Sequence, residues 1–366
     1  MLYGGAATMA LMASVYLLFR RGNAFAPDIT TPVRLRLWTA AFFASLALGH
    51  VWYLPVVFFT TDDGAVLSDL IGGLLDSLVV FPLAIVILFE MLQDRRRPLW
   101  PVGVMVAPMV VGIVMCLGKR STVYLPLLRG YFVLLDIGLV VYMSHEVWRY
   151  GHWLRDNYAD LEHKEVWHSL VVLASVLLVL GFYTLGVGGV YYDYIVQVAC
   201  ILLVGYLLWR VETLSDLSTH WSQSLSTDEA AVIATLEGNV LSANIRENIG
   251  SLLQQYCVDT QLYLQHDLTL AQLAKAVGTN RYYLSQYFSS QGLTYNLYIN
   301  NLRINHFVSL YREAVAAQRP FTVVQLASNS GYRSYSTFSL AFKQRMGQNV
   351  SAWMRGVKDE MRSPFL

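Results

Sequence analysis

Three ionisable residues, Asp76, Arg129 and Asp136, lie inside otherwise apolar stretches of the sequence. Asp69 stands one heptad before Asp76, as Arg129 does before Asp136, so each pair would share a helix face. A charge at the centre of a bilayer costs about 2.5–3.5 kcal/mol on insertion scales, and such groups usually face other helices and pair. The pattern predicts either a polar centre that responds to a ligand or signal, or a structural ion pair. Replacing Asp76 or Arg129 with a neutral isostere distinguishes these two roles. If the pair is only structural, the substituted protein should insert correctly and respond to the signal as before.

No motif in the sequence indicates catalysis. The H-E-x-x-H and G-x-S-x-G motifs, the phosphate-binding P-loop and the dinucleotide fingerprint are all absent. The cysteines Cys116, Cys200 and Cys257 do not have the spacing of a metal site, and two of them lie in apolar runs. We therefore expect a protein that is not an enzyme and that holds no metal or cofactor.

The elements that carry the charged residues are long and apolar. The chain is 55% hydrophobic and only 14% charged, whereas a soluble domain has about 25% charged residues. A helix of about 20 residues crosses the hydrocarbon core of a bilayer. Seven segments are long enough and carry few charges, and the first lacks the preceding basic residue of a signal peptide. They are roughly Leu2–Phe19, Leu37–Phe59, Val66–Leu92, Leu99–Leu117, Val123–Ser144, Val166–Gly186 and Val190–Trp209.

Basic residues in the predicted loops indicate an orientation for this domain. The loops after the first, third and fifth segments carry ten Lys and Arg residues, whereas the opposite side carries only Lys119 and Arg120. This bias predicts an N-terminus outside the cell. Because seven is an odd number, it places everything after the last span in the cytoplasm.

The composition changes after Trp209, which predicts three regions. Residues 1–209 form the membrane domain, residues 210–244 a linker or helical extension of the last span to about Leu225, and residues 245–366 a terminal domain. A short helix is expected near Asp228–Leu236 within the linker. The terminal region has 12 Lys and Arg residues against 6 Asp and Glu, and the rest has 14 against 19. A basic terminal domain predicts an anionic partner.

The terminal region contains the same helical pattern twice. In "LTLAQLAKAVGTNRYYLSQYFSSQG", Thr269 can cap a helix with a buried apolar stripe, and Gly278 supplies the turn before a second helix. In "FTVVQLASNSGYRSYSTFSLAFKQRMG", Thr322 and Gly331 take the same places. The segment Thr294–Ala314 between them predicts one long helix. We therefore expect an all-α protein in which a seven-helix membrane bundle precedes a double helix–turn–helix domain.

This terminal region resembles the AraC/XylS-type transcription regulators over about 100 residues. The second repeat contains the pattern G-Y-x-S-x-S-x-F-x-x-x-F-K-x-x-x-G, and "YINNLRI" begins at Tyr298. The general layout is similar to that of the membrane-embedded AraC-type regulators of bacteria. Three positions depart from the pattern: Leu340 replaces a polar or basic reader, Val350 replaces a proline, and Gly292 comes one residue early.

The resemblance implies that the second helix of each repeat enters a major groove of double-stranded DNA. Gln286 could read adenine through two hydrogen bonds, while Arg281, Arg333 and Lys343 would contact phosphate. The full set implied by the resemblance is Arg281, Tyr282, Ser285, Gln286, Arg333, Ser334, Tyr335, Ser336, Ser339 and Lys343.

These features predict a membrane-bound one-component transcription regulator of the bacterial inner membrane. Its partners would be double-stranded DNA and the lipid bilayer, with a homodimer and a small-molecule or protein signal left open. The alternative is a transporter- or receptor-like protein whose terminal domain anchors DNA or binds a protein without regulating transcription. Promoter occupancy that changes with a signal would favour the first of these.

Overall fold

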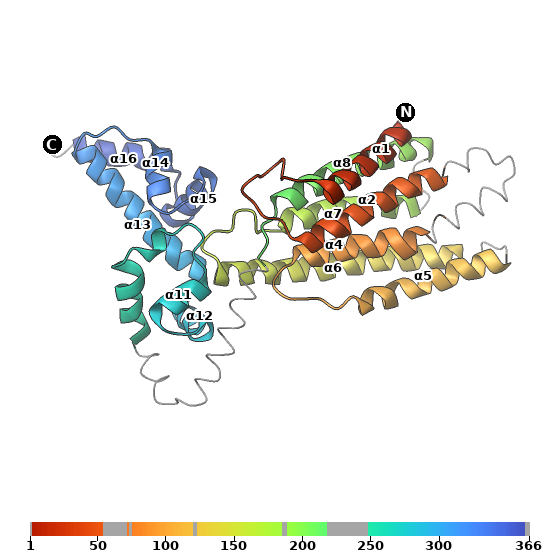
Figure 1. The fold of residues 1–366 in the computed structure, drawn as a ribbon, viewed down its shortest axis with the longest axis horizontal. Coiled ribbons are helices and arrows are strands. Elements are labelled where there is room, and N and C mark those ends of the chain that lie inside the picture. The colour runs from red at the N-terminus through yellow and green to blue at the C-terminus, as the bar shows by residue number, and fades with distance from the viewer. Residues whose placement is uncertain are drawn as a thin grey trace, which may run out of the picture. The chain divides into compact units, whose positions relative to one another are not determined.

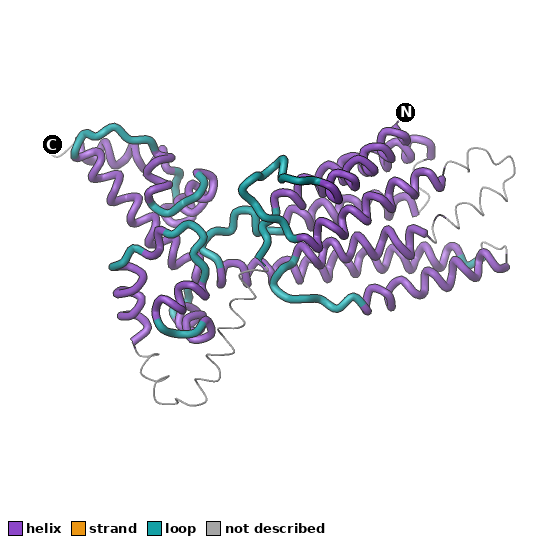
Figure 2. The backbone as a smooth tube through the Cα atoms, in the orientation of Figure 1, coloured by secondary structure: helices purple, strands orange, loops and turns teal. Residues whose placement is uncertain are grey.

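A computed structural model describes residues 2–53, 72, 75–119, 123–184, 189–217 and 248–362. These residues form helices and connecting loops and contain no strand, which confirms the predicted all-α class (Figures 1 and 2). The chain divides into two compact units. The N-terminal unit comprises Met1–Tyr150 and His163–Thr219, and the C-terminal unit comprises Gly151–Glu162 and His220–Leu366.

The helices of the N-terminal unit lie side by side in Figure 1, and α1 packs against both α2 and α8. Among the residues that the structure describes, four helical stretches are long and apolar enough to cross a membrane: Leu2–Phe19, Trp100–Lys119, Leu125–Asn157 and Tyr194–Thr213. The predicted number of seven spans stays a prediction. The helices are α1 (Leu2–Phe19), α2 (Val33–Tyr53), η2 (Asp76–Val80), α4 (Phe81–Met91), α5 (Trp100–Lys119), α6 (Leu125–Asn157), α7 (Trp167–Thr184) and α8 (Gly189–Thr213).

Large apolar side chains cover the outside of these helices. Soluble monomers rarely expose contiguous apolar surface of this kind, whereas the acyl chains of a bilayer solvate it at no cost. Most of the exposed positions are Leu, Val or Met, and they include Met12, Val104, Leu127, Leu134 and Leu202.

Basic residues in the loops of this unit also join helix ends. Arg20 donates to the carboxylate of Glu212 over 2.6 Å, and Glu212 is completely buried. Arg97 and Arg95 both donate to the carboxylate of Glu146 on α6. These arginines belong to the loops from which we predicted the orientation, so the same residues contribute to packing at the helix ends.

Helix α8 ends at Thr213, which corrects the expected helical extension to about Leu225. The backbone beyond it makes tertiary hydrogen bonds in place of helical ones. The amide of Ser215 donates to the carbonyl of His163, and the amide of Leu217 donates to the side chain of Gln93. The expected helix near Asp228–Leu236 lies outside the described residues.

The C-terminal unit contains both predicted helix–turn–helix repeats. Its two cores meet on α13, which supplies Tyr295 and Ile299 to the first core and Ile304, Phe307 and Tyr311 to the second. Each short helix therefore packs against one half of a single long helix. The helices are η3 (Gln254–Val258), η4 (Leu262–Leu264), α11 (Leu270–Val277), α12 (Arg281–Ser290), α13 (Tyr295–Ala316), α14 (Val323–Asn329), α15 (Tyr335–Met346) and α16 (Val350–Arg362).

Candidate nucleic-acid interface

Capping hydrogen bonds mark the start of each helix in the first helix–turn–helix, and a glycine forms the turn between them. The side chain of Thr269 accepts from the amide of Gln272, and Gln272 bonds back to the amide of Thr269, which makes a capping box at the start of α11. Gly278 follows α11 with φ of 78°, a left-handed conformation that glycine adopts without steric cost. Asn280 then caps α12 through the amide of Tyr283. The chain is thus turned sharply between two short helices.

Helix α12 buries one face and exposes the other. Leu284 and Phe288 are buried in the first core, whereas Tyr282 is 65% exposed and Gln286 is exposed. Arg281 and Ser285 are half-buried at the edge of the same face. All four predicted contact residues of this repeat therefore lie on the accessible side of the helix or at its rim.

The second repeat is built in the same way. Thr322 caps α14 by accepting from the amide of Gln325, and Ser334 caps α15 by accepting from the amide of Thr337. Gly331 lies between the helices with φ of 88°. Phe338 and Phe342 are completely buried, so the opposite face of α15 remains accessible.

That accessible face carries most of the predicted contact residues of the second repeat. Tyr335, Ser336 and Lys343 are exposed, and Ser339 is half-buried. Leu340 lies among them and is 71% exposed. An apolar side chain on a recognition helix can contact the methyl group of thymine. Leu340 can therefore still contact a base, although it departs from the polar pattern at this position.

Several predicted contact residues make internal contacts in the structure. The hydroxyl of Ser334 bonds to those of Ser336 and Thr337 in addition to capping α15. Arg333 is half-exposed, and its guanidinium lies 3.6 Å from a carboxylate oxygen of Asp267. An exposed ion pair of this kind contributes about 0–1 kcal/mol, so Arg333 can exchange it for a phosphate at little cost.

Helix α13 holds the two repeats at a fixed separation. Its 22 residues extend about 33 Å at 1.5 Å per residue, and one repeat packs on each half of that length. Arg303, near its middle, is 1% exposed and donates to the carbonyls of Tyr263, Gln265 and His266. Burial lowers the pKa of Arg303, a shift that Tyr332 and neighbouring groups oppose.

Among the described residues, no ion pair connects Asp76, Arg129 and Asp136, the three residues of the predicted polar centre, to one another. Asp136 is buried, and neither of its carboxylate oxygens has a hydrogen-bond partner within the described part of the chain. Arg129 is exposed two turns earlier on α6. Asp76 begins η2, with a carboxylate oxygen 4.0 Å from the position that a Cβ on Gly49 would take. Asp136 is thus buried, whereas Asp76 is half-buried and Arg129 is exposed. Asp69 lies outside the described residues.

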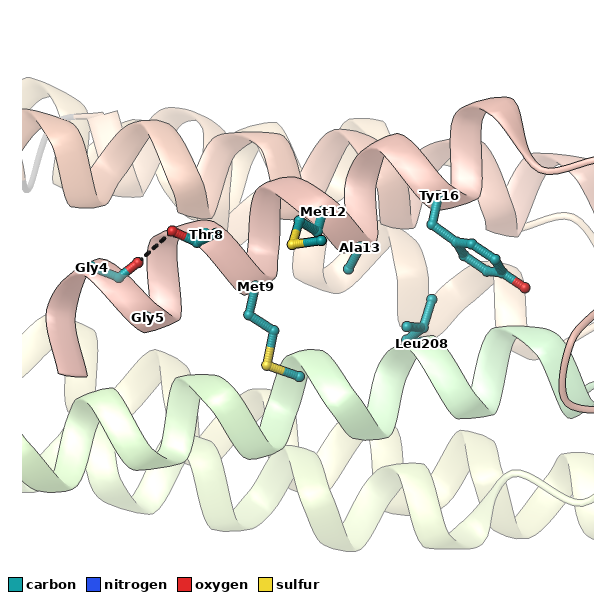
Figure 3. Close-up of a pocket in the computed structure, with 8 residues that line it drawn as sticks. All are labelled: Gly4, Gly5, Thr8, Met9, Met12, Ala13, Tyr16 and Leu208. Atoms are coloured by element: carbon teal, nitrogen blue, oxygen red, sulfur yellow. Dashed lines mark hydrogen bonds between the residues drawn. The ribbon is translucent and has the colours of Figure 1, made fainter. Parts of the chain in front are cut away.

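The N-terminal unit also has a groove of about 670 Å³ beside α1 and α8. Figure 3 shows the side chains of Met9, Met12 and Leu208 along it, and Thr8 donates to the carbonyl of Gly4. The hydroxyl of Tyr16 lies 3.4 Å from the carboxylate of Glu212. The residues that line the groove therefore supply no charged group for catalysis or for binding an ionic ligand.

Some relevant residues could not be identified from the sequence. Thr337 lies in the first turn of α15 and donates its hydroxyl to the carboxylate of Glu162. Arg303 belongs to the "YINNLRI" segment, but its three carbonyl partners are about 40 residues away in the chain. Only the folded chain brings such partners together.

A comparison with protein families supports the same assignment. A family model described as a helix-turn-helix domain, of the AraC type, matches residues 273–356. Comparisons with curated proteins and with solved structures returned no match. The match extends from α11 to α16, so it includes both repeats and the long helix between them. The chain thus has an AraC-type helix–turn–helix domain at its C-terminus, a domain typical of DNA-binding transcription regulators and not of enzymes.

Proposed function

We propose that the protein is a membrane-bound one-component transcription regulator that binds promoter DNA through α12 and α15. The observation that supports this most strongly is the pair of capped helix–turn–helix repeats on one long helix. Each repeat has a buried aromatic anchor on one face of its second helix and accessible polar residues on the other. Helices of this kind place their first residues against base edges in the major groove.

The same chain has helices of membrane length, which supports a DNA-binding unit attached to a bilayer. Positive-inside loops and the predicted odd number of spans support an N-terminus outside and the C-terminal unit in the cytoplasm of a bacterial inner membrane. Only that side gives access to chromosomal DNA.

In this proposal the N-terminal unit detects a signal in the envelope or membrane. A signal shifts an equilibrium only if it binds two conformations with different affinity. The buried carboxylate of Asp136 supports a polar centre in this unit, because an unpaired ionisable group inside a membrane bundle is costly. Asp136→Asn that leaves every signal response unchanged would remove this residue from the sensing mechanism.

Genome-wide occupancy of the tagged full-length protein tests the function directly. We expect occupancy at defined promoters that changes with growth conditions. In a Gln286→Ala/Lys343→Ala double variant, sites should be lost, because the variant removes one base-reading amide and one phosphate contact. A matched Lys358→Ala variant changes an exposed residue on α16 and should keep the sites. Uniform background occupancy by the unmodified protein would refute promoter binding.

Lys343→Ala should weaken binding of the full-length protein in lipid nanodiscs to a labelled 40-base-pair duplex. Each neutralised phosphate adds about 0.9 to the slope of log K against log salt concentration. The affinity of the Lys343→Ala variant should therefore depend less steeply on salt, with a slope smaller in magnitude by about one. The slope for Lys358→Ala should be unchanged. Fluorescence anisotropy over a range of salt concentrations measures both slopes. Equal slopes for Lys343→Ala and the unmodified protein would exclude Lys343 from the phosphate contacts.

A further inference from the structure

A short acidic segment outside the matched domain is folded into the C-terminal unit. Residues Gly151–Glu162 precede the helix–turn–helix repeats by about 110 residues, yet they belong to the same compact unit. Ala159 is 1% exposed and lies in the first hydrophobic core. The segment Tyr158–Glu162, which we call the clasp, directly follows the last residue of α6.

Backbone hydrogen bonds attach the start of the clasp to the first repeat. Tyr158 and Thr269 form an antiparallel bridge, and the amide of Ala159 donates to the carbonyl of Leu268 over 3.3 Å. The side chain of Asn296 donates to the carbonyls of Tyr158 and Ala159, over 3.2 and 2.7 Å. Three polar contacts and a buried methyl group thus hold this end immediately before α11.

The same end of the clasp lies near the first residue of α12. Burial raises the pKa of Tyr158 to about 12, and the positive charge of Arg281 opposes that shift. Arg281 is a predicted phosphate contact. The clasp therefore lies within electrostatic range of Arg281 at the start of the first recognition helix.

The other end of the clasp carries a carboxylate to the second recognition helix. The amide of Glu162 donates to Asp160, which shapes a turn, and Glu162 accepts a hydrogen bond of 3.0 Å from the hydroxyl of Thr337. Thr337 is the third residue of α15. The N-terminus of a helix attracts negative charge, and there a carboxylate and a phosphate compete for the same field.

We propose that the clasp is an autoinhibitory contact, in which Glu162 occupies the place of a DNA phosphate at the start of α15. This inference rests on the proposed DNA-binding function. Phosphate cannot approach the Thr337 hydroxyl while the Glu162 carboxylate accepts its hydrogen bond, and two negative groups at that position repel each other. Because the clasp directly follows α6, a movement of that helix would pull on Glu162 through continuous backbone.

The test measures affinity for a labelled 40-base-pair duplex of mixed sequence, with the full-length protein in lipid nanodiscs. Glu162→Gln removes the competing charge, and we expect binding about three- to tenfold tighter, because the neutral amide can still accept from Thr337 but no longer repels a phosphate. Asn296→Ala loosens the clasp at its other end and should change affinity in the same direction. Glu313→Gln, an equal change of charge at an exposed site on α13, is the control and should have a smaller effect.

Hydrogen exchange provides a reciprocal measurement, because linked equilibria act in both directions. Saturating the unmodified protein with the duplex should speed exchange of the Ala159 amide and its neighbours, since DNA displaces the clasp. If Glu162→Gln binds no more tightly than Glu313→Gln, or if DNA leaves exchange of the clasp unchanged, the autoinhibitory role is wrong while DNA binding stands. If neither the unmodified protein nor any variant binds the duplex, the proposed function is wrong as well.

Discussion

Arg303→Met is expected to lower the free energy of unfolding of residues 245–366 by about 1–3 kcal/mol, the cost of leaving a buried polar group without its partner. Methionine removes a buried charge that is costly to desolvate, which by itself would be favourable. However, the carbonyl of the buried residue Tyr263 would lose its donor, while those of the exposed residues Gln265 and His266 can accept from water instead. Each buried acceptor without a partner costs about 1–3 kcal/mol. The unsatisfied carbonyl of Tyr263 and the lost contact with the ring of Tyr332 outweigh one relieved charge, so the net effect is destabilising.

Arg303 also joins the two halves of the domain. Its guanidinium bonds to the segment before α11, and it lies 5.5 Å from the ring centroid of Tyr332 in the second repeat. We therefore expect Arg303→Met to separate the unfolding of the two cores as well as to weaken both. Denaturation in urea followed by circular dichroism reports all helices. Fluorescence of Trp353, the single tryptophan between residues 245 and 366, reports the second core.

Arg303→Lys is the matched control for charge. Lysine keeps the positive charge but lacks the planar arrangement of donors with which arginine reaches several carbonyls at once. We expect a loss between that of Arg303→Met and zero. A methionine variant as stable as the unmodified domain, with coincident transitions, would show that Arg303 is not what joins the halves.

Local sequence patterns predicted the elements of the C-terminal unit well. The caps at Thr269 and Thr322, the turns at Gly278 and Gly331 and the helix from Thr294 all depend on neighbours within four residues, so they can be read from the sequence. The predicted helix to Ala314 matches α13, which ends at Ala316. The buried positions of α11, Leu270, Leu273, Ala274 and Val277, follow directly from helical spacing.

Contacts between distant segments could not be predicted in this way. The predicted fifth span ended at Ser144 because the following residues are charged and aromatic, but α6 continues to Asn157. Its charged extension leads into the clasp. The hydrogen-bond partners of the clasp lie more than 100 residues later in the chain. Periodicity identifies the buried face of a helix but not its partner, so neither the clasp nor the bonds of Arg303 had a sequence signal of their own.

The two turn glycines look equivalent in the sequence, but the structure predicts very different responses to substitution. Gly331→Ala should lower the free energy of unfolding by about 2–4 kcal/mol, from a left-handed backbone and an overpacked contact. A Cβ on Gly331 would lie 2.9 Å from both the Cα and the carbonyl oxygen of Leu264, and 3.0 Å from Nε of Arg303. Backbone atoms of Leu264 cannot move aside as a flexible side chain would, so the two repeats would have to separate.

Gly278→Ala is the matched control for this prediction. Gly278 has a similar φ of 78°, but a Cβ there would meet nothing within 4 Å. Gly278→Ala should lower the free energy of unfolding by only about 1–2 kcal/mol, the cost of a left-handed backbone for alanine. The difference between the two variants in urea denaturation therefore isolates the approach of Leu264 to Gly331. Equal losses would mean that the second turn has room for a methyl group, and that the close packing between the repeats does not constrain this position.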